Sequence, residues 1–410
     1  MNRRSVCRRG AALGLTALAL AVGLVLAFGD GPGSFGGALG GPSAGSGEGG
    51  QIDLSRLGQT LDLTGYARAQ APAALQFPRD HGPHPAFGSE WWYYTGNLVA
   101  ADGRRFGFEL TFFRVSLAPP SAAAGQASAF ATHQVYMAHL AITDVAGRRF
   151  EAVERFERPV LGLAGAQAEP FRVWLRDWQA RALPAASRVS GSPFPLQLQA
   201  AQDGLGIDLR LENDRPPVLQ GERGLSRKGA APGDASYYYS YTRLRARGTL
   251  RLGQAQFAVQ GLAWMDREWS TTALGAQRIG WDWFALQLDD GADLMFCRIR
   301  RADGAANPFD YGVWVRPDGS YRVLAADEVQ LAVTDHWRSP ATGVRYPAAW
   351  RLTVGPAAAR LTVRPLLAGQ ELDLAVRYWE GAVTTTGTVA GRPVAGHGYV
   401  ELTGYDAAAE

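Results

Sequence analysis

Cysteine and lysine are scarce in this chain of 410 residues. The two cysteines, Cys7 and Cys297, cannot build a disulfide framework, and Cys7 precedes the first apolar run, where no lipid-modified cysteine of an export signal would stand. Lys228 is the single lysine, so arginine supplies nearly all of the positive charge. We interpret the missing lysines as a compositional bias and not as a functional signal.

A concentrated basic face is also missing. The net charge is +3, and it falls to −1 without the four arginines at positions 3, 4, 8 and 9. A protein that binds a phosphate backbone needs a basic surface, so the sequence argues against nucleic acid as a partner. The chain has no phosphate-binding glycine loop, no serine-hydrolase elbow, no His-Glu-x-x-His and no Cys-x-x-Cys. We therefore expect neither a cofactor nor a bound metal.

The N-terminus predicts export. A basic stretch, "MNRRSVCRRG", precedes an apolar run that ends at Phe28. Residues 1–28 are either a signal peptide, cleaved after Val25-Leu26-Ala27, or an uncleaved anchor that holds the protein at the inner membrane. Either alternative predicts a periplasmic location, with the N-terminal segment as the contact to the membrane surface. Residues 29–74 then form a linker, because residues 29–50 contain eleven glycines.

The remaining sequence predicts short β-strands connected by turns. "RRFGFELTFFRV", "HQVYMAHLAI" and "GIDLRLE" have the two-residue alternation of β-strands, and "ADGRR", "DDGAD" and "RPDGS" are turn signals. "SYYYSYTRLRARGTLRL" predicts one long bent strand. These patterns indicate an all-β, antiparallel protein with two barrel domains, at residues 75–248 and 249–405.

The stretch "GLAWMDREWS" is the strongest candidate for chemistry. Trp264, Asp266 and Glu268 alternate along a predicted strand and share one face. An acid between bulky apolar neighbours has its pKa raised by desolvation and can act as a general acid at neutral pH. The alternative is an ion pair of Asp266 or Glu268 with Arg267 or Arg298, and the sequence leaves both interpretations open.

A second unusual stretch is "HPAFGSEWWYYTGNL". Glu90 shares a strand face with Trp92 and Tyr94, and a buried carboxylate is costly unless it is paired. We expect an arginine partner for Glu90, or a role in ligand binding. The aromatic residues of these stretches form either an ordinary core or the wall of an apolar pocket. The candidate wall residues are Trp92, Trp264, Trp269, Tyr239, Tyr241, Trp281 and Trp283.

"HPAFGSEWWYYTGNL", "MDREWS" and "WDWFALQL" together resemble the AttH/CrtC-type family of lipocalin-like proteins, over about residues 77–403. The family includes carotenoid 1,2-hydratase (hydroxyneurosporene synthase). The resemblance implies two calycin-like, or lipocalin-like, β-barrels and an apolar ligand such as an isoprenoid or lipid. Its hydratase members add water to the terminal double bond of acyclic carotenoids without a cofactor.

The resemblance also implies a role for Asp266. In the hydratases the aspartate follows an aromatic residue and one other, as in Trp264-Met265-Asp266, and it would protonate the alkene to give a carbocation that water captures. Tyr239 or Tyr241 stands near the hydratases' His-x-Trp pair, which this chain lacks. Three hypotheses follow. The first is an exported lipocalin-like protein that binds an apolar or amphiphilic ligand, such as a lipid or isoprenoid, as a non-catalytic carrier would. The second is a cofactor-independent hydratase of isoprenoid alkenes that acts through Asp266, and the third is a membrane-tethered assembly module without a ligand.

Overall fold

The computed structural model describes residues 52–53, 63–123, 132–184, 190–271 and 278–405. The expected signal or anchor at 1–28 and most of the predicted linker at 29–74 lie outside these residues. The described end of the linker packs against the fold, because Tyr66 and Ala69 are buried and Tyr66 Oη donates a hydrogen bond to Ser116 Oγ at 3.2 Å. In the part of the chain that the structure describes, no helix has the length and apolarity needed to cross a membrane.

The first sheet has the strand order β5-β4-β3-β2-β14-β13-β10-β9-β8-β7-β6, and β11 and β12 also pair with β13. Its strands are β2 (Ser89–Ala100), β3 (Arg105–Ser116), β4 (Gln134–Asp144), β5 (Arg149–Glu157), β6 (Ala164–Gln167), β7 (Arg172–Leu175), β8 (Trp178–Ala182), β9 (Leu196–Gln202), β10 (Leu205–Glu212), β11 (Val218–Leu219), β12 (Leu225–Arg227), β13 (Ala235–Leu252) and β14 (Ala255–Ser270).

The second sheet has the order β18-β17-β16-β15-β24-β23-β21-β20-β19, and β22 also pairs with β23. Its strands are β15 (Arg278–Leu288), β16 (Asp293–Arg301), β17 (Tyr311–Val315), β18 (Tyr321–Ala325), β19 (Val329–Arg338), β20 (Arg345–Val354), β21 (Ala359–Pro365), β22 (Glu371–Asp373), β23 (Val376–Val389) and β24 (Arg392–Leu402). The other elements are short, namely β1 (Ile52–Asp53), η2 (Arg79–His81), α2 (Pro120–Ala123), η3 (Ala326–Glu328) and η4 (Gly355–Ala357).

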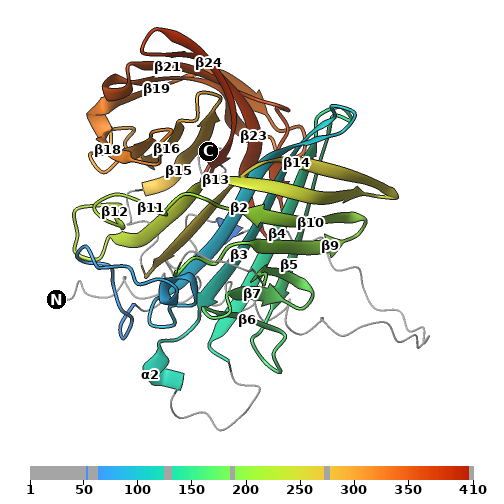
Figure 1. The fold of residues 1–410 in the computed structure, drawn as a ribbon. Coiled ribbons are helices and arrows are strands. Elements are labelled where there is room, and N and C mark those ends of the chain that lie inside the picture. The colour runs from blue at the N-terminus through green and yellow to red at the C-terminus, as the bar shows by residue number, and fades with distance from the viewer. Residues whose placement is uncertain (1–51, 54–62, 124–131, 185–189, 272–277, 406–410) are drawn as a thin grey trace, which may run out of the picture. The chain divides into compact units, whose positions relative to one another are not determined.

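The strand pairs in both sheets are antiparallel, and the sheets are strongly curved in Figure 1, the first from blue to yellow and the second from orange to red. The predicted all-β class with lipocalin-like antiparallel sheets is confirmed. The Asp-Gly turns lie where the sequence predicts them, with left-handed backbone at Gly103 (φ 85°), Gly291 (φ 91°) and Gly319 (φ 84°). The predicted long bent strand is β13, and its pairing with β14 shifts register between Tyr241 and Leu244.

The change from one sheet to the other differs from the expected boundary at 248/249. That position lies inside β13, and β14 continues the first sheet because it pairs with both β13 and β2. The change therefore falls between Ser270 and Arg278. Sequence alone could not reveal this, since β14 finds its second partner, β2, at the far end of the first sheet's sequence.

Each sheet encloses its own apolar core, and a third buried cluster joins residues of both sheets. In this cluster Tyr93 and Trp264 of the first sheet lie with Trp283 and Tyr399 of the second. Hydrogen bonds also cross here, for example from Asn97 Nδ2 to the Gly398 carbonyl at 2.9 Å. The contact between the sheets contains most of the polar side chains considered below.

Candidate active site

A cavity of about 80 Å³ lies where the sheets meet. β2, β3, β13 and β14 supply its wall on one side, and β15, β16, β23 and β24 supply it on the other. Aromatic and apolar side chains form much of the wall, namely Trp91, Tyr93, Phe113, Val115, Tyr238, Trp281, Trp283, Ile299 and Tyr378. Several ionisable groups share it, namely Glu90, Arg114, Lys228, Asp266, Glu268, Cys297 and Glu401.

Asp266 on β14 is buried and accepts three hydrogen bonds. Ser240 Oγ and Trp264 Nε1 donate to its Oδ1 at 2.5 and 2.7 Å, and Tyr238 Oη donates to its Oδ2 at 2.5 Å. The antiparallel register explains the cluster, because Ser240 lies directly opposite Asp266 and Tyr238 lies two residues away on the same face. Trp283 Nε1 of the second sheet donates to Tyr238 Oη at 3.1 Å. Both sheets therefore organise this carboxyl.

Burial raises the pKa of the Asp266 carboxyl to about 7, although the three donors act in the opposite direction. Neither of the arginines expected as alternative partners reaches it. Arg267 pairs with Glu90, and Arg298 pairs with Asp282. Asp266 can therefore exchange a proton near neutral pH, which is the property that general acid–base catalysis requires.

Lys228, the single lysine, lies in the same cavity. Its Nζ is 3.0 Å from Glu268 Oε1, and Ser236 Oγ also donates to that carboxylate. Burial opposes the charge of Lys228, but Glu268 outweighs it and raises the pKa of the amine. The pair brings a fixed cation and anion beside Asp266.

Glu401 on β24 faces the cavity from the second sheet. Burial raises the pKa of its carboxyl to about 8, against a hydrogen bond from Trp281. Two further carboxyls lie behind the wall. Glu109 accepts hydrogen bonds from Thr111 and Tyr378, and Glu380 accepts one from Tyr93 at 2.6 Å.

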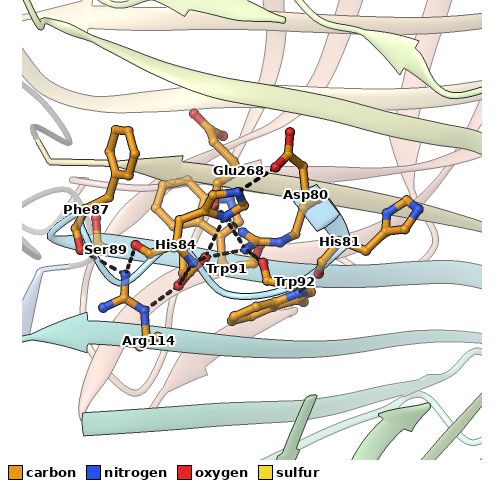
Figure 2. A network of polar contacts seen from close by, with 12 residues as sticks. Asp80, His81, His84, Phe87, Ser89, Trp91, Trp92, Arg114 and Glu268 are labelled. Atoms are coloured by element: carbon orange, nitrogen blue, oxygen red, sulfur yellow. Dashed lines mark hydrogen bonds and ion pairs between the residues drawn. The ribbon is translucent and has the colours of Figure 1, made fainter. Parts of the chain in front are cut away.

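Glu90 forms the centre of an ion network at the edge of the cavity. Arg114 Nε and Arg267 Nη2 each contact one of its oxygens, and the His84 backbone N–H donates to both at 3.0 Å. Figure 2 shows His84 beside Asp80 and Arg114 below it in the same network. Burial opposes ionisation, but the two arginines hold the pKa of Glu90 well below its usual range. Glu90 therefore has the expected arginine partner, and it has two of them, Arg114 and Arg267.

The structure separates the residues predicted for the site into two groups. Asp266, Glu90, Trp281 and Trp283 line the cavity, and Trp264 contacts Asp266 from just behind it. The others lie in the core enclosed by the first sheet and do not line this cavity. These residues are Trp92, Trp269, Tyr239 and Tyr241. The physical reason is strand alternation, since the odd-numbered side chains of β14, those of β13 as far as Tyr241, and the even-numbered side chains at Trp92 and Tyr94 of β2 point into that core.

Several residues that line the cavity or contact Asp266 are not among those predicted from the sequence. Tyr238 and Ser240 lie on the even-numbered face of β13, and the spacing of Asp266 and Glu268 on β14 could have pointed to them if the register had been known. Lys228 could have been found because it is the single lysine of the sequence, a feature that is interpreted above as compositional bias. The sequence around Glu401 contains no signal for the site, because no local pattern shows that β24 faces β14.

Comparisons with known proteins agree with this geometry. The model of the AttH-like family matches residues 68–405. The crystal structure of an AttH from Nitrosomonas europaea is 35% identical, covers 83% of this chain and 99% of its own, and has a TM-score of 0.71. Kievitone hydratase from Nectria haematococca is 14% identical, covers 83% of this chain and 96% of its own, and has a TM-score of 0.63, which shows a shared fold. A search of curated protein sequences found no match.

Proposed function

This chain belongs to the AttH-like family, and from that premise we propose that it is a hydratase, which adds water to a carbon–carbon double bond of an apolar substrate. The substrate class that we propose is an isoprenoid alkene, such as an acyclic carotenoid. One observation carries the proposal. A buried carboxyl with a pKa of about 7, Asp266, lies in an aromatic cavity, and the three groups that donate hydrogen bonds to it are all neutral.

Hydration of an alkene needs a proton donor and an environment that stabilises the carbocation intermediate. Addition of a proton to the less substituted alkene carbon produces a tertiary carbocation, and the capture of this cation by water gives an alcohol after loss of one proton. The faces of Tyr93, Trp281 and Trp283 can stabilise the cation through their quadrupoles. Asp266 is the carboxyl that exchanges a proton during this sequence. A cavity of about 80 Å³ accommodates the reacting end of a chain and water, so a longer chain would extend outward.

The kievitone hydratase neighbour supports the proposal in a limited way. Its name describes a hydratase, and its fold is the same, so this architecture is compatible with water addition. Its identity to this chain is too low to transfer a substrate. The isoprenoid preference comes from the resemblance to the carotenoid hydratases described above.

The test is turnover by wild-type protein and by Asp266→Asn. Lycopene, an acyclic carotenoid, is incubated with each protein, and products heavier by one water are quantified by mass spectrometry. We expect turnover by the wild type and a loss of about 10²–10⁴-fold in Asp266→Asn. Asp303→Asn, at an exposed carboxyl, is the matched control and should behave as the wild type. A folded Asp266→Asn variant with unchanged turnover would contradict the assignment.

The second candidate function is a lipid or isoprenoid carrier without turnover. The aromatic wall supports it, because such walls bind apolar ligands whether or not chemistry follows. A carrier predicts a shift in tryptophan fluorescence with lycopene or oleic acid, weaker in Trp281→Ala or Trp283→Ala, and no product. The absence of both a fluorescence shift and a product would leave the assembly module as the remaining alternative.

We also propose that the protein is exported, and that residues 1–28 provide the signal or the anchor to the inner membrane. The periplasm would then be where it meets its apolar ligand. Cell fractionation of the full chain, with an N-terminal sequence of the recovered protein, tests this. Recovery in the cytoplasm would contradict the export proposal.

A further inference from the structure

The cavity holds a second carboxyl with a raised pKa, on the sheet that faces Asp266. Resting on the proposed function, we propose that Glu401 donates the proton to the alkene and that Asp266 accepts the proton from the attacking water. This assigns two catalytic residues, one from each sheet, and gives Asp266 the opposite role to the one that the resemblance implies. The substrate's double bond and the water would lie between the two carboxyls.

The hydrogen bonds around Asp266 favour its ionised form. Trp264 Nε1 can only donate, so it needs an acceptor in the aspartate. Trp283 Nε1 can also only donate, and it points at Tyr238 Oη, which directs the tyrosine hydroxyl proton toward Asp266. Protonation of Asp266 at Oδ2 would force Tyr238 to turn this proton away. The network is therefore built to receive a negative charge, as a base requires.

The surroundings of Glu401 favour its neutral form, because burial and neighbouring carboxylates outweigh the hydrogen bond that Trp281 donates to it. Burial and the charges of Glu401 and Glu109 raise the pKa of Glu380, and burial and the charge of Glu109 raise the pKa of Glu401. The three residues lie on β23, β24 and β3. Glu109 Oε2 and Glu380 Oε2 have no hydrogen-bond partner among the described residues. Like charges that are buried together cannot all ionise, so protons stay on this cluster at neutral pH. Glu401 is the member of the cluster that lines the cavity.

The Glu401 carboxylic acid gives its proton to the less substituted alkene carbon, which leaves a Glu401 carboxylate and a tertiary carbocation. The oxygen of a water molecule forms a bond to the cation, and the Asp266 carboxylate takes one of its protons. The net reaction is alkene plus water to tertiary alcohol. The proton on Asp266 then returns to Glu401 through water in the cavity, so no other reactant is consumed.

The first experiment needs no ligand. Infrared difference spectra of wild type minus Glu401→Gln, and of wild type minus Asp266→Asn, isolate the C=O band of each protonated carboxyl as pH is raised. The inference predicts that the Glu401 band persists to higher pH than the Asp266 band. The same midpoint for both bands, or the reverse order, overturns it. Circular dichroism and thermal unfolding establish that both isosteric variants are folded.

The second experiment measures lycopene hydration across pH. Both variants should lose at least about 100-fold in turnover, whereas Glu154→Gln, at a carboxyl outside the cavity, should keep wild-type turnover. The residual rate of Glu401→Gln should lack the fall at high pH, and that of Asp266→Asn should lack the fall at low pH. Wild-type turnover in Glu401→Gln overturns this inference and leaves the proposed function intact. No turnover by the wild-type protein overturns the proposed function and the catalytic role of Glu401 together.

Discussion

Replacement of Glu90 by alanine should be among the most destabilising single changes in the protein. Glu90 is fully buried, and it is the shared counter-charge of Arg114 and Arg267, whose side chains are also fully buried. Removal of one partner from a buried ion pair costs about 3–5 kcal/mol, because the remaining charge is left without compensation. Here two guanidinium groups lose their partner, so we expect a loss at the upper end, about 5 kcal/mol. Typical domains have about 5–15 kcal/mol of stability in total.

Equilibrium unfolding in urea measures this loss as a lower midpoint with an unchanged slope. The matched control is Glu151→Ala, which breaks the exposed pair with Arg149 and should cost at most about 1 kcal/mol. The Glu90 pKa is depressed in the folded state, so its contribution is present above the unfolded value of about 4.3 and is lost as the pH falls below it. The difference between wild type and Glu90→Ala should therefore shrink in acid. A loss of less than about 1 kcal/mol at neutral pH would refute the structural role of Glu90.

Three further predictions concern the cavity. Because the folded pKa of Glu401 is raised to about 8, its burial is unfavourable once it ionises, so Glu401→Gln should raise the melting temperature relative to wild type at about pH 9 and have little effect near pH 4. Lys228→Met should destabilise the protein by about 2 kcal/mol or more, measured by urea unfolding, because Glu268 loses its cation, and Lys228→Arg should recover most of the loss. Trp283→Phe removes the donor to Tyr238, so it should lower hydration of lycopene about tenfold without unfolding the protein, as checked by circular dichroism.

The sequence predicts the architecture well, because strands and turns are local features. Alternation in β3 and β4 and the left-handed glycine at Gly103 need only neighbouring residues to be recognised. The pairing of β14 with β2 is not local, and for that reason the expected boundary at 248/249 differs from the observed change of sheets after Ser270.

The candidate site depends on register, which explains why only part of it was predicted. Asp266 and Trp264 were found together because they are two residues apart on one strand. The sequence predicts Tyr239 and Tyr241 of β13 for the site, but the register places Ser240 opposite Asp266, so the even-numbered Tyr238 is the tyrosine that contacts Asp266. A one-residue difference along a strand exchanges the two faces of the sheet.

The position of Glu401 in the second wall of the cavity could not be predicted from sequence, although Trp281 and Trp283 of that wall were. Glu401 reaches the cavity because the two sheets pack against each other through large side chains such as Tyr93 and Trp283, whose rings lie 5.3 Å apart. This contact joins residues that are 190 positions apart in the sequence. Neither the composition nor the periodicity of the sequence predicts this packing of the two sheets.

The most direct measurement is mass spectrometry of an organic extract from the full chain purified from its native cells. We predict an isoprenoid together with a second species heavier by one water, which are the substrate and the product of hydration. Recovery of phospholipid or fatty acid alone, with no such pair, would contradict the hydratase assignment and favour a carrier.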